Sequence, residues 1–397
     1  MAERSVRTQV GIVGAGPAGL LLSHLLHLRG VESVVVDLQP REHIEQTIRA
    51  GILEQGTVDL LRQTGVGDRM VREGFVHHGI NLAFAGGVHR IDLHELTGGR
   101  SVMVYPQHEV LVDLIARRLA DGGDIRFGVG DTTVDGLEGE RPTIRFRHED
   151  GPRTLECDFV VGADGSRTFT RYLIPEGRVR TDFFRQYPFA WFGVLAEAPR
   201  SSEELIYAHS ERGFVLVSTR SATVQRLYFQ CDPTTSVDDW SDDRIWEEFE
   251  ARLALSGATV KTGTIFKKDV LQFRSFVCEP MQHGRLFLAG DAAHTVPPTG
   301  AKGMNLAVAD VHVLDRALGA WYEAKDSGPL EAYTRTVLRR IWRAQHFSWW
   351  MTSMLHRFSD ATDFDLRRQL AELETVTSSQ AGSRLLAESY VGWPLPS

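Results

Sequence analysis

Cysteine is scarce in this sequence of 397 residues. Cys157, Cys231 and Cys278 lie far apart and form no Cys-x-x-Cys pair, which argues against a disulfide framework and against a cysteine-rich zinc site. We therefore expect reduced thiols. His24 and His27 lie three residues apart, but no further ligands accompany them, so we predict no metal site.

Long apolar segments are also lacking. No stretch is apolar for the length of a bilayer crossing. The opening MAERSVRTQVGIVGAG enters a strand-like run without the apolar core and cleavage site of a signal peptide. The sequence therefore predicts a cytoplasmic protein that has no membrane partner.

A basic run is missing as well. The formal net charge of -8 is spread along the chain, so nucleic acid is not an expected partner, although local basic sites stay open. Apolar residues at 42% and charged residues at 24% are typical of a folded protein. This length allows two lobes around a shared ligand.

The residues that are present open with a βαβ pattern. Residues 9–13 and 33–36 have the composition of buried strands, and residues 20–28 between them have that of a helix. Two later runs, 158–161 and 285–289, also resemble buried strands that end at glycine. We expect these strand ends to point toward one ligand-sized crevice.

A glycine motif occupies the first of these strand ends. Gly14, Gly16 and Gly19 form G-x-G-x-x-G between strand and helix, and Asp37 closes the next strand. Such glycines allow a pyrophosphate to approach the helix N-terminus, and the acid accepts ribose hydroxyls. The motif predicts a dinucleotide site, with a plain glycine-rich turn as the alternative.

Two further loops place Asp beside Gly after a strand, at Asp164-Gly165 and Gly290-Asp291. Each by itself is also ordinary turn chemistry. In this order with the first motif, the chain resembles the flavoprotein aromatic hydroxylases. The resemblance implies FAD, with Asp291 on the ribityl chain and Asp164 where the flavin and nicotinamide sites meet.

The segment 297–305 is expected to begin a helix whose first N–H groups face the flavin pyrimidine edge, where they would stabilise negative charge. The alternative is an ordinary proline-capped helix start. By the same resemblance, the cofactor contacts expected here and elsewhere are Gly303, Met304, Asn305, Arg49 and Gln107.

The resemblance narrows to the hydroxylases that act on 4-hydroxybenzoate, and it runs from residues 49–56 to residues 388–392. It implies that Arg220 pairs with the substrate carboxylate and that Ser218 and Tyr228 donate hydrogen bonds to it. A guanidinium binds a carboxylate bidentately, more strongly in an apolar pocket than in water. The alternative is that Ser218 and Arg220 share a solvent-exposed strand face.

The phenol end of such a substrate needs a group that removes a proton. The resemblance assigns the phenol contact to Tyr207 and a relay toward solvent to Tyr390 and His77, with Pro298 completing the catalytic and substrate contacts. Imidazole suits the end of this relay because it changes charge near neutral pH. The alternative places all three residues in the core or on the surface.

The implied fold is α/β. A Rossmann-like FAD-binding βαβ domain of the glutathione-reductase type is expected from residues 1–75, 100–180 and 275–345. An inserted, mostly antiparallel substrate domain is expected from residues 76–99 and 181–274, and C-terminal interface helices from residues 346–397. Aromatic residues in those helices, Phe347, Trp349 and Trp350, favour a homodimer by analogy with the family.

The implied reaction converts 4-hydroxybenzoate to 3,4-dihydroxybenzoate with O2 and NADH or NADPH through a flavin C4a-hydroperoxide. One alternative is a related flavin hydroxylase that acts on another phenolic acid. Two others are an FAD-dependent dehydrogenase that does not transfer oxygen and a nucleotide-binding regulatory protein.

The nicotinamide site departs from the family pattern. NADPH-preferring members carry arginines after the second strand, where this chain has Leu38 and Thr47, and Glu42 and Glu45 add negative charge. We therefore predict that NADH is accepted well. The candidate contacts to the nicotinamide dinucleotide are Arg167, Arg171 and Arg274.

Overall fold

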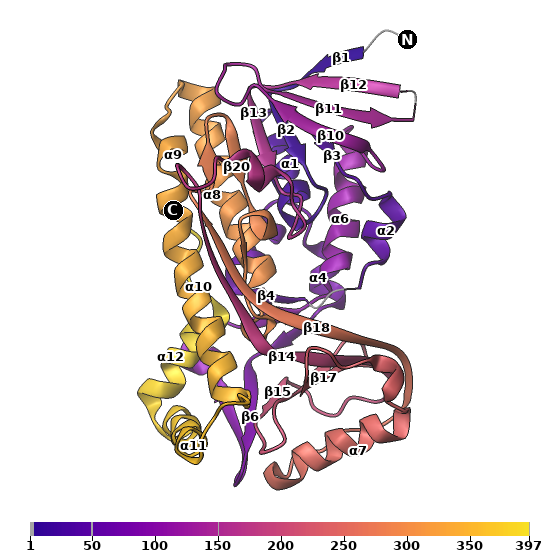
Figure 1. Cartoon of the computed structure of the whole chain (residues 1–397), viewed down its shortest axis with the longest axis vertical. Helices are drawn as coiled ribbons and strands as arrows, with labels where there is room; N and C mark the ends of the chain where they lie inside the picture. Colours follow the sequence, from indigo (N-terminus) through magenta and orange to yellow (C-terminus); the bar gives the residue numbers. More distant parts are fainter. Residues whose placement is uncertain (1–3, 49–50, 150, 397) are drawn as a thin grey trace.

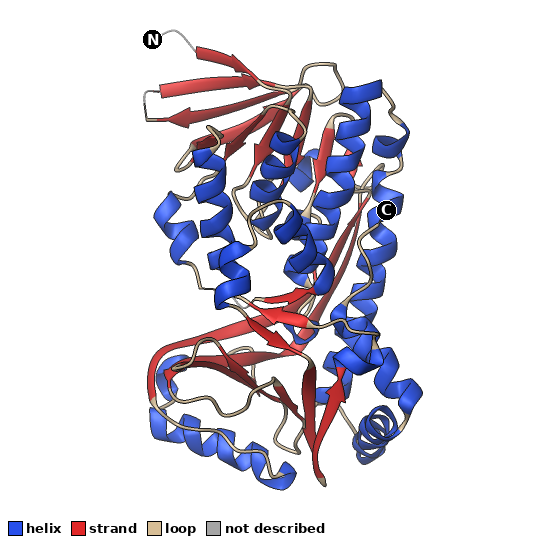
Figure 2. Cartoon of the chain, turned by 180° about the vertical axis from the view of Figure 1, so that it is seen from behind, coloured by secondary structure: helices blue, strands red, loops and turns tan. Residues whose placement is uncertain are grey.

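The computed structural model describes residues 4–48, 51–149 and 151–396. Two sheet-based regions lie toward opposite ends of its long axis, and one long helix runs beside both (Figure 1). The same division is visible from behind, where most helices gather around the upper region (Figure 2).

The upper region contains a six-stranded sheet, which is parallel except at its β19 edge. Its central strands are buried on both faces, as their apolar, β-branched sequences predict. The predicted βαβ unit and both later strands are confirmed: each strand bound agrees within one residue, and the helix begins three residues earlier than predicted, at Pro17. The strands, in sheet order, are β19 (Gln282–His283), β20 (Leu286–Leu288), β13 (Phe159–Gly162), β2 (Val10–Val13), β3 (Ser33–Val36) and β9 (Asp124–Arg126).

Helices cover this sheet, and two smaller sheets flank it. The helices are α1 (Pro17–Leu28), α2 (Arg41–Gln46), α3 (Gln55–Gln63), α4 (Asp68–Glu73), α6 (Gln107–Ala120) and α8 (Gly303–Ala324). One small sheet joins β1 (Arg4–Arg7), β12 (Gly151–Glu156), β11 (Thr143–His148) and β10 (Gly130–Asp135), and the other joins β4 (Ile52–Glu54), β8 (Val102–Val104) and β5 (Phe75–His77).

The lower region is built on an eight-stranded sheet that is antiparallel except where β15 pairs with β6. One face packs against α7 (Asp242–Leu253) and the other against the C-terminal helices. The strands, in sheet order, are β21 (His294–Thr295), β18 (Thr264–Glu279), β14 (Thr181–Glu197), β17 (Val224–Cys231), β16 (Val215–Thr219), β15 (Ile206–Ala208), β6 (Gly79–Phe84) and β7 (Gly87–Asp92).

The C-terminal part is helical, as its periodicity predicts. The long helix α10 passes through residue 345, so the interface region is continuous with the rest of the chain (Figure 1). Within the described part of the chain, no helix combines the length and apolar character needed to span a bilayer. The helices not yet given are α5 (Leu93–Leu96), α9 (Gly328–Glu331), α10 (Tyr333–Leu355), α11 (Asp363–Ser378) and α12 (Gln380–Val391).

Candidate active site

Strand register brings the predicted substrate residues to one face of the large sheet. Tyr207 on β15 pairs with Leu216 on β16, which pairs with Tyr228 on β17. Directly opposed residues in antiparallel strands point to the same side, and so do residues two apart on one strand. Ser218 therefore shares this face, and the same alternation carries Arg220 to it just past the end of β16.

This face is enclosed by the C-terminal helices. Tyr207, Leu216 and Tyr228 belong to one buried cluster with Phe347 of α10 and Tyr390 of α12. Tyr207 is 1% exposed and Tyr228 5%. Ser218 and Arg220, for which a solvent-exposed face was the alternative, are half-buried on this face.

The end of this face where a carboxylate is expected holds the Arg220 guanidinium, which is incompletely paired. Arg220 interacts with the Tyr228 hydroxyl, but its Nε is buried and has no hydrogen-bond partner among the described residues. Burial lowers the pKa of Arg220 to about 10, which Tyr228 opposes. The group is still charged at pH 7, and a carboxylate placed beside it would satisfy the unpaired donor.

Arg226 is a second cation that sequence reasoning missed at this end. Its Nε donates to the Tyr228 hydroxyl at 2.9 Å, and its side chain pairs with Asp269 at 2.8 Å. The Ser218 hydroxyl donates to the Arg226 carbonyl oxygen at 3.0 Å. Alternation along β17 could have indicated that Arg226 and Tyr228 share a face, but the pairing with Asp269 depends on β18.

The end of this face where a phenol is expected holds two buried tyrosine hydroxyls in direct contact. The hydroxyl oxygens of Tyr207 and Tyr390 lie 2.7 Å apart, although the residues are 183 positions apart in sequence. Burial raises the pKa of Tyr207, and burial together with Tyr207 raises the pKa of Tyr390 well above its ordinary value. Both hydroxyls are therefore protonated at neutral pH, and each can donate one hydrogen bond while accepting another.

His77, the proposed end of the relay, is 3% exposed on β5. Its Nδ1 is buried without a partner, and no direct hydrogen bond to Tyr390 is formed within the described residues. Burial lowers its pKa below 6.5. The negative charge of Glu204 raises this pKa, and the positive charge of Arg200 lowers it. The imidazole is thus neutral at pH 7 and can accept a proton, and a water molecule would be needed to join it to the tyrosines.

The first glycine motif has the close contacts that its spacing predicts. A Cβ on Gly14, whose φ is +112°, would lie 2.2 Å from the Ala163 carbonyl oxygen, and one on Gly19 would lie 1.9 Å from that of Gly14. A Cβ on Gly16 would approach nothing closer than 4.0 Å, so this side is open to a ligand. The Asp37 carboxylate accepts hydrogen bonds from the Ala15 and Gln39 amides at the same strand ends.

The Asp164 carboxylate organises its own loop. It accepts hydrogen bonds from the hydroxyls of Thr168 and Thr170, both at 2.6 Å, and from the Phe169 amide at 2.9 Å. These contacts set the course of the loop that is expected at the junction of the flavin and nicotinamide sites. Such an arrangement positions backbone groups, with the side chain itself already engaged.

The three expected nicotinamide contacts differ in their surroundings. Arg171 is buried: it donates to the Ala292 carbonyl oxygen at 3.0 Å and lies over the Phe276 ring. It therefore ties the second fingerprint loop to the third. Arg167 and Arg274 are exposed and remain available for an anion.

The third fingerprint leads into α8. Asp291 lies in a 3-10 turn (Gly290–Ala292) that is held by the buried Asp310, which accepts from the Gly290 amide at 2.9 Å and contacts His294 at 2.6 Å. Gly303 and Met304 begin α8, where a Cβ on Gly303 would meet open space. The first N–H groups of a helix lack intrahelical partners, so they can bind a ligand at this end.

Asn305 and Lys302 connect this helix to the rest of the site. The Asn305 side chain accepts from Thr57 and Glu54 and donates to Ile52 and Ala301 carbonyls. The Lys302 ammonium, missed by sequence reasoning, is buried and donates to Glu54 at 2.7 Å and to the Tyr390 carbonyl oxygen at 2.9 Å. Because no fixed spacing links these segments, only the fold could reveal the contact.

The remaining expected residues lie around the same loops. Pro298 is half-buried in a 3-10 turn (Pro298–Gly300) just before α8. Gln107 is the first residue of α6, and the adjacent His108 is close enough to Arg220 for that charge to lower the pKa of His108, after burial. Arg49 lies outside the described residues.

FAD fits these features. The open side of Gly16, the acid at Asp37 and the open N-terminus of α8 follow one another along the carboxyl ends of β2, β3 and the β20 loop. In α/β sheets, dinucleotides bind outside the carboxyl ends of the strands. Arg220, which follows β16 of the eight-stranded sheet, lies near this dinucleotide region because its charge acts on His108 of α6.

Comparison with known proteins agrees with an FAD site in this chain. The FAD binding domain family matches residues 7–348. A solved p-nitrophenol 4-monooxygenase from Pseudomonas putida has the same fold, with a TM-score of 0.81 at 19% identity over 98% of this chain and 99% of its own. The chain therefore belongs to the FAD-binding family of flavoprotein hydroxylases, and it is an FAD-dependent monooxygenase.

A closer relative narrows the class. The chain is 44% identical to the p-hydroxybenzoate hydroxylase of Acinetobacter baylyi over 98% of its own length and 96% of that protein. It is 25% identical to a phenol 2-monooxygenase of Aspergillus fumigatus over 99% of its length and 67% of that protein.

Proposed function

We propose that this enzyme hydroxylates 4-hydroxybenzoate to 3,4-dihydroxybenzoate, using O2 and a reduced nicotinamide. The observation that carries the proposal is that one enclosed face of the substrate sheet bears both a buried guanidinium with an unpaired donor and a pair of tyrosine hydroxyls in contact. The likeness to a p-hydroxybenzoate hydroxylase supports this choice over other phenolic acids.

The spacing of the two ends suits a benzoate ring. Adjacent strands lie about 5 Å apart and residues about 3.4 Å apart along a strand, so Ser218 is roughly 7 Å along β16 from Leu216, the cross-strand neighbour of Tyr207. Side chains that converge from these positions can contact opposite ends of one ring. Arg220, with Tyr228, would bind the carboxylate.

Bound FAD would accept hydride and supply the activated oxygen. The protein's own residues have three tasks. Tyr207 would accept a hydrogen bond from the substrate phenol and pass its proton to Tyr390, after which His77 would take the proton through water. The enclosing helices α10 and α12 exclude bulk water from this face. The open N-terminus of α8 would stabilise negative charge at the pyrimidine edge of the flavin ring.

NADH is the proposed reductant. Leu38 is 69% exposed at the position where a 2'-phosphate would be recognised, and it offers that group no charge. Arg41, three residues after Leu38, is paired with Glu45 at 2.7 Å. Arg167 and Arg274 are the proposed pyrophosphate contacts.

Flavin absorbance during titration with 4-hydroxybenzoate, followed by product identification, tests the proposal. A spectral shift and 3,4-dihydroxybenzoate formed in proportion to NADH consumed are expected. Nicotinamide oxidation without a hydroxylated product would favour a dehydrogenase. A larger kcat/KM for another substituted benzoate would favour the alternative of a related flavin hydroxylase that acts on another phenolic acid. A purified protein that cannot take up FAD would exclude catalytic turnover.

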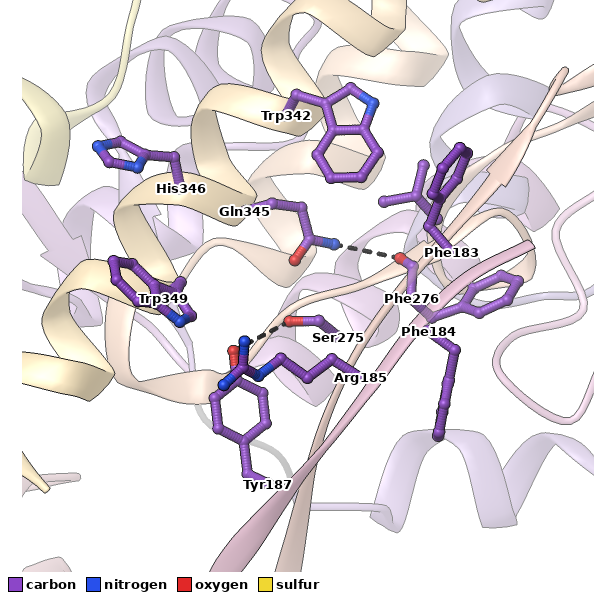
Figure 3. Close-up of a pocket in the computed structure, with 11 residues that line it drawn as sticks. Phe183, Phe184, Arg185, Tyr187, Ser275, Phe276, Trp342, Gln345, His346 and Trp349 are labelled. Carbon is purple, nitrogen blue, oxygen red and sulfur yellow. Dashed lines mark hydrogen bonds between the residues drawn. The ribbon is translucent and has the colours of Figure 1, made fainter. Parts of the chain in front are cut away.

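A homodimer is proposed as the working assembly, in the cytoplasm where reduced nicotinamides are available. Its support is an apolar groove of about 350 Å³ between β14, β18 and α10. Phe183, Trp342 and Trp349 line it (Figure 3) and are each more than 40% exposed, whereas Phe347 and Trp350 of the same helix pack inward. Sedimentation of wild type and Trp349→Glu tests this, with a shift toward monomer expected.

A further inference from the structure

Arginines gather on one side of α10, away from the residues assigned to catalysis. Arg335, Arg339 and Arg343 follow at intervals of four, and all three are exposed. This spacing puts them on one helix face over about 12 Å. Together with Arg340 and the C-terminal segment, they line a groove of about 850 Å³.

Among the residues that the structure describes, no acidic side chain lines the groove. Its lining within the described chain consists of these four arginines, Thr336, Trp393, Pro394 and Pro396. Arg335 and Arg339 make no hydrogen bond or ion pair with any other described residue, and Arg343 only stacks on the Trp393 ring at 4.4 Å. In a chain with a net charge of -8, three neighbouring guanidinium groups that have no acidic partner among the described residues form a local concentration of positive charge.

The wall opposite α10 is held in place from inside the protein. Arg340 donates to the carbonyl oxygens of Trp393 and Pro394 at 2.7 and 3.0 Å, and its other nitrogen pairs with the buried Glu54 at 2.6 Å. His312 contacts the Pro396 carbonyl oxygen at 3.0 Å. Arg340 is therefore committed to the structure, and the other three arginines face a preformed groove.

The geometry points to a binding site in this groove for a small molecule that carries two or more adjoining phosphate groups. A single exposed ion pair contributes at most about 1 kcal/mol, so a monovalent anion would not be retained. Guanidinium groups one helical turn apart can bind successive phosphates, each with paired N–H donors. An inorganic polyphosphate and a nucleotide share this chemistry.

Calorimetric titration of the FAD-loaded enzyme with sodium tripolyphosphate at low ionic strength tests the site. The double variant Arg335→Gln/Arg339→Gln should weaken binding about tenfold or more, since two charge-assisted contacts are lost. The control Arg72→Gln/Arg367→Gln removes the same charge from exposed arginines on α4 and α11 and should change binding by no more than about twofold.

Three results would overturn the inference. Equal binding by wild type and the α10 double variant would place the anion elsewhere, for example at the nicotinamide site, where it would compete with NADH. Equal weakening by the control would show a net-charge effect. Absence of tripolyphosphate binding, with the α10 variant dissociating a wild-type dimer, would assign the groove to a second copy of the chain.

The source of the phosphates follows from a second ligand. If ATP binds more tightly than tripolyphosphate, and Trp393→Leu removes only this advantage, the ligand is a nucleotide whose base contacts the indole. Equal affinities would favour an inorganic chain. Both results support the site, because each requires binding that depends on Arg335 and Arg339.

Discussion

The two ends of the proposed substrate face both lie largely inside the protein but are chemically opposite. At one end Arg220 and Arg226 approach the same Tyr228 hydroxyl, and a buried donor of Arg220 is unpaired. At the other end the hydroxyls of Tyr207 and Tyr390 share one hydrogen bond, and neither carries a charge. Burial disfavours charge in both places. An anion would therefore complete the first end, whereas the second could move a proton without holding a charge at rest.

The largest effect is expected from a substitution at the uncharged end, where the Tyr207 and Tyr390 hydroxyls lie. Tyr207→Phe removes the hydroxyl that would receive the phenol proton, so kcat for hydroxylation should fall about 10² to 10³-fold, while flavin absorbance should show substrate affinity changed by no more than about threefold. Tyr187→Phe, which removes another buried hydroxyl bonded to Ser275, is the matched control. A comparable loss in that control would reduce the role of Tyr207 to packing.

At the charged end, a substitution should weaken the binding of 4-hydroxybenzoate more than it lowers kcat. Arg220→Gln is expected to raise the dissociation constant of 4-hydroxybenzoate about 10²-fold, because a charge-assisted contact inside a buried site contributes about 2 to 3 kcal/mol. Arg226→Gln should have a smaller effect, because Arg226 acts through Tyr228. Phenol lacks the carboxylate, so unequal losses for phenol and 4-hydroxybenzoate are required. Equal losses would contradict the assignment.

The pH profile should locate the end of the proton chain. The lowered pKa of His77 keeps the ring neutral at pH 7, and only the neutral ring accepts a proton. The rate should therefore be constant near neutrality and decrease as the pH falls through that pKa, which lies below 6.5. His77→Asn should lower kcat about tenfold at pH 8 and abolish this acid limb. An acid limb that persists in the variant would exclude His77.

The smallest effect is expected where an anion, the 2'-phosphate of NADPH, would be recognised at the exposed surface and not inside the protein. Adding cations by Leu38→Arg and Thr47→Arg should raise kcat/KM for NADPH relative to NADH by about fivefold per site or less, since exposed pairs contribute at most about 1 kcal/mol. Stopped-flow reduction of the flavin by each nicotinamide measures it. Wild type should not favour NADPH. A kcat/KM for NADPH tenfold above that for NADH would refute the predicted preference.

Much of the fold could be predicted because the signals were local. The strand 33–36 is found as Ser33–Val36, and the predicted strand 158–161 is found as Phe159–Gly162, because runs of β-branched and apolar residues act through their immediate neighbours. The small sheet of β4, β8 and β5 was not predicted. Its strands have three residues each, too few to show a period.

Site residues divide in the same way. Gly14, Gly16, Gly19 and Asp37 were predictable because a turn, a helix start and a strand end impose them at set spacings. The contacts of Lys302 with Glu54 and Tyr390 were not, since they join residues up to 248 positions apart. The engagement of Asp164 by its own loop and of Arg171 by the Ala292 carbonyl oxygen was equally invisible, because a sequence motif does not say which partner a side chain takes.

The amino-acid sequence thus determined the cofactor-binding frame and the types of residue available for chemistry, because glycine turns and strand periods are short-range properties of the chain. Only the tertiary structure decided which of those residues share a surface. It set the register that aligns Tyr207 with Tyr228, folded α12 over them, and assembled the arginines of α10 with the C-terminal segment into one groove. Long-range packing makes these choices, since it depends on all the elements at once.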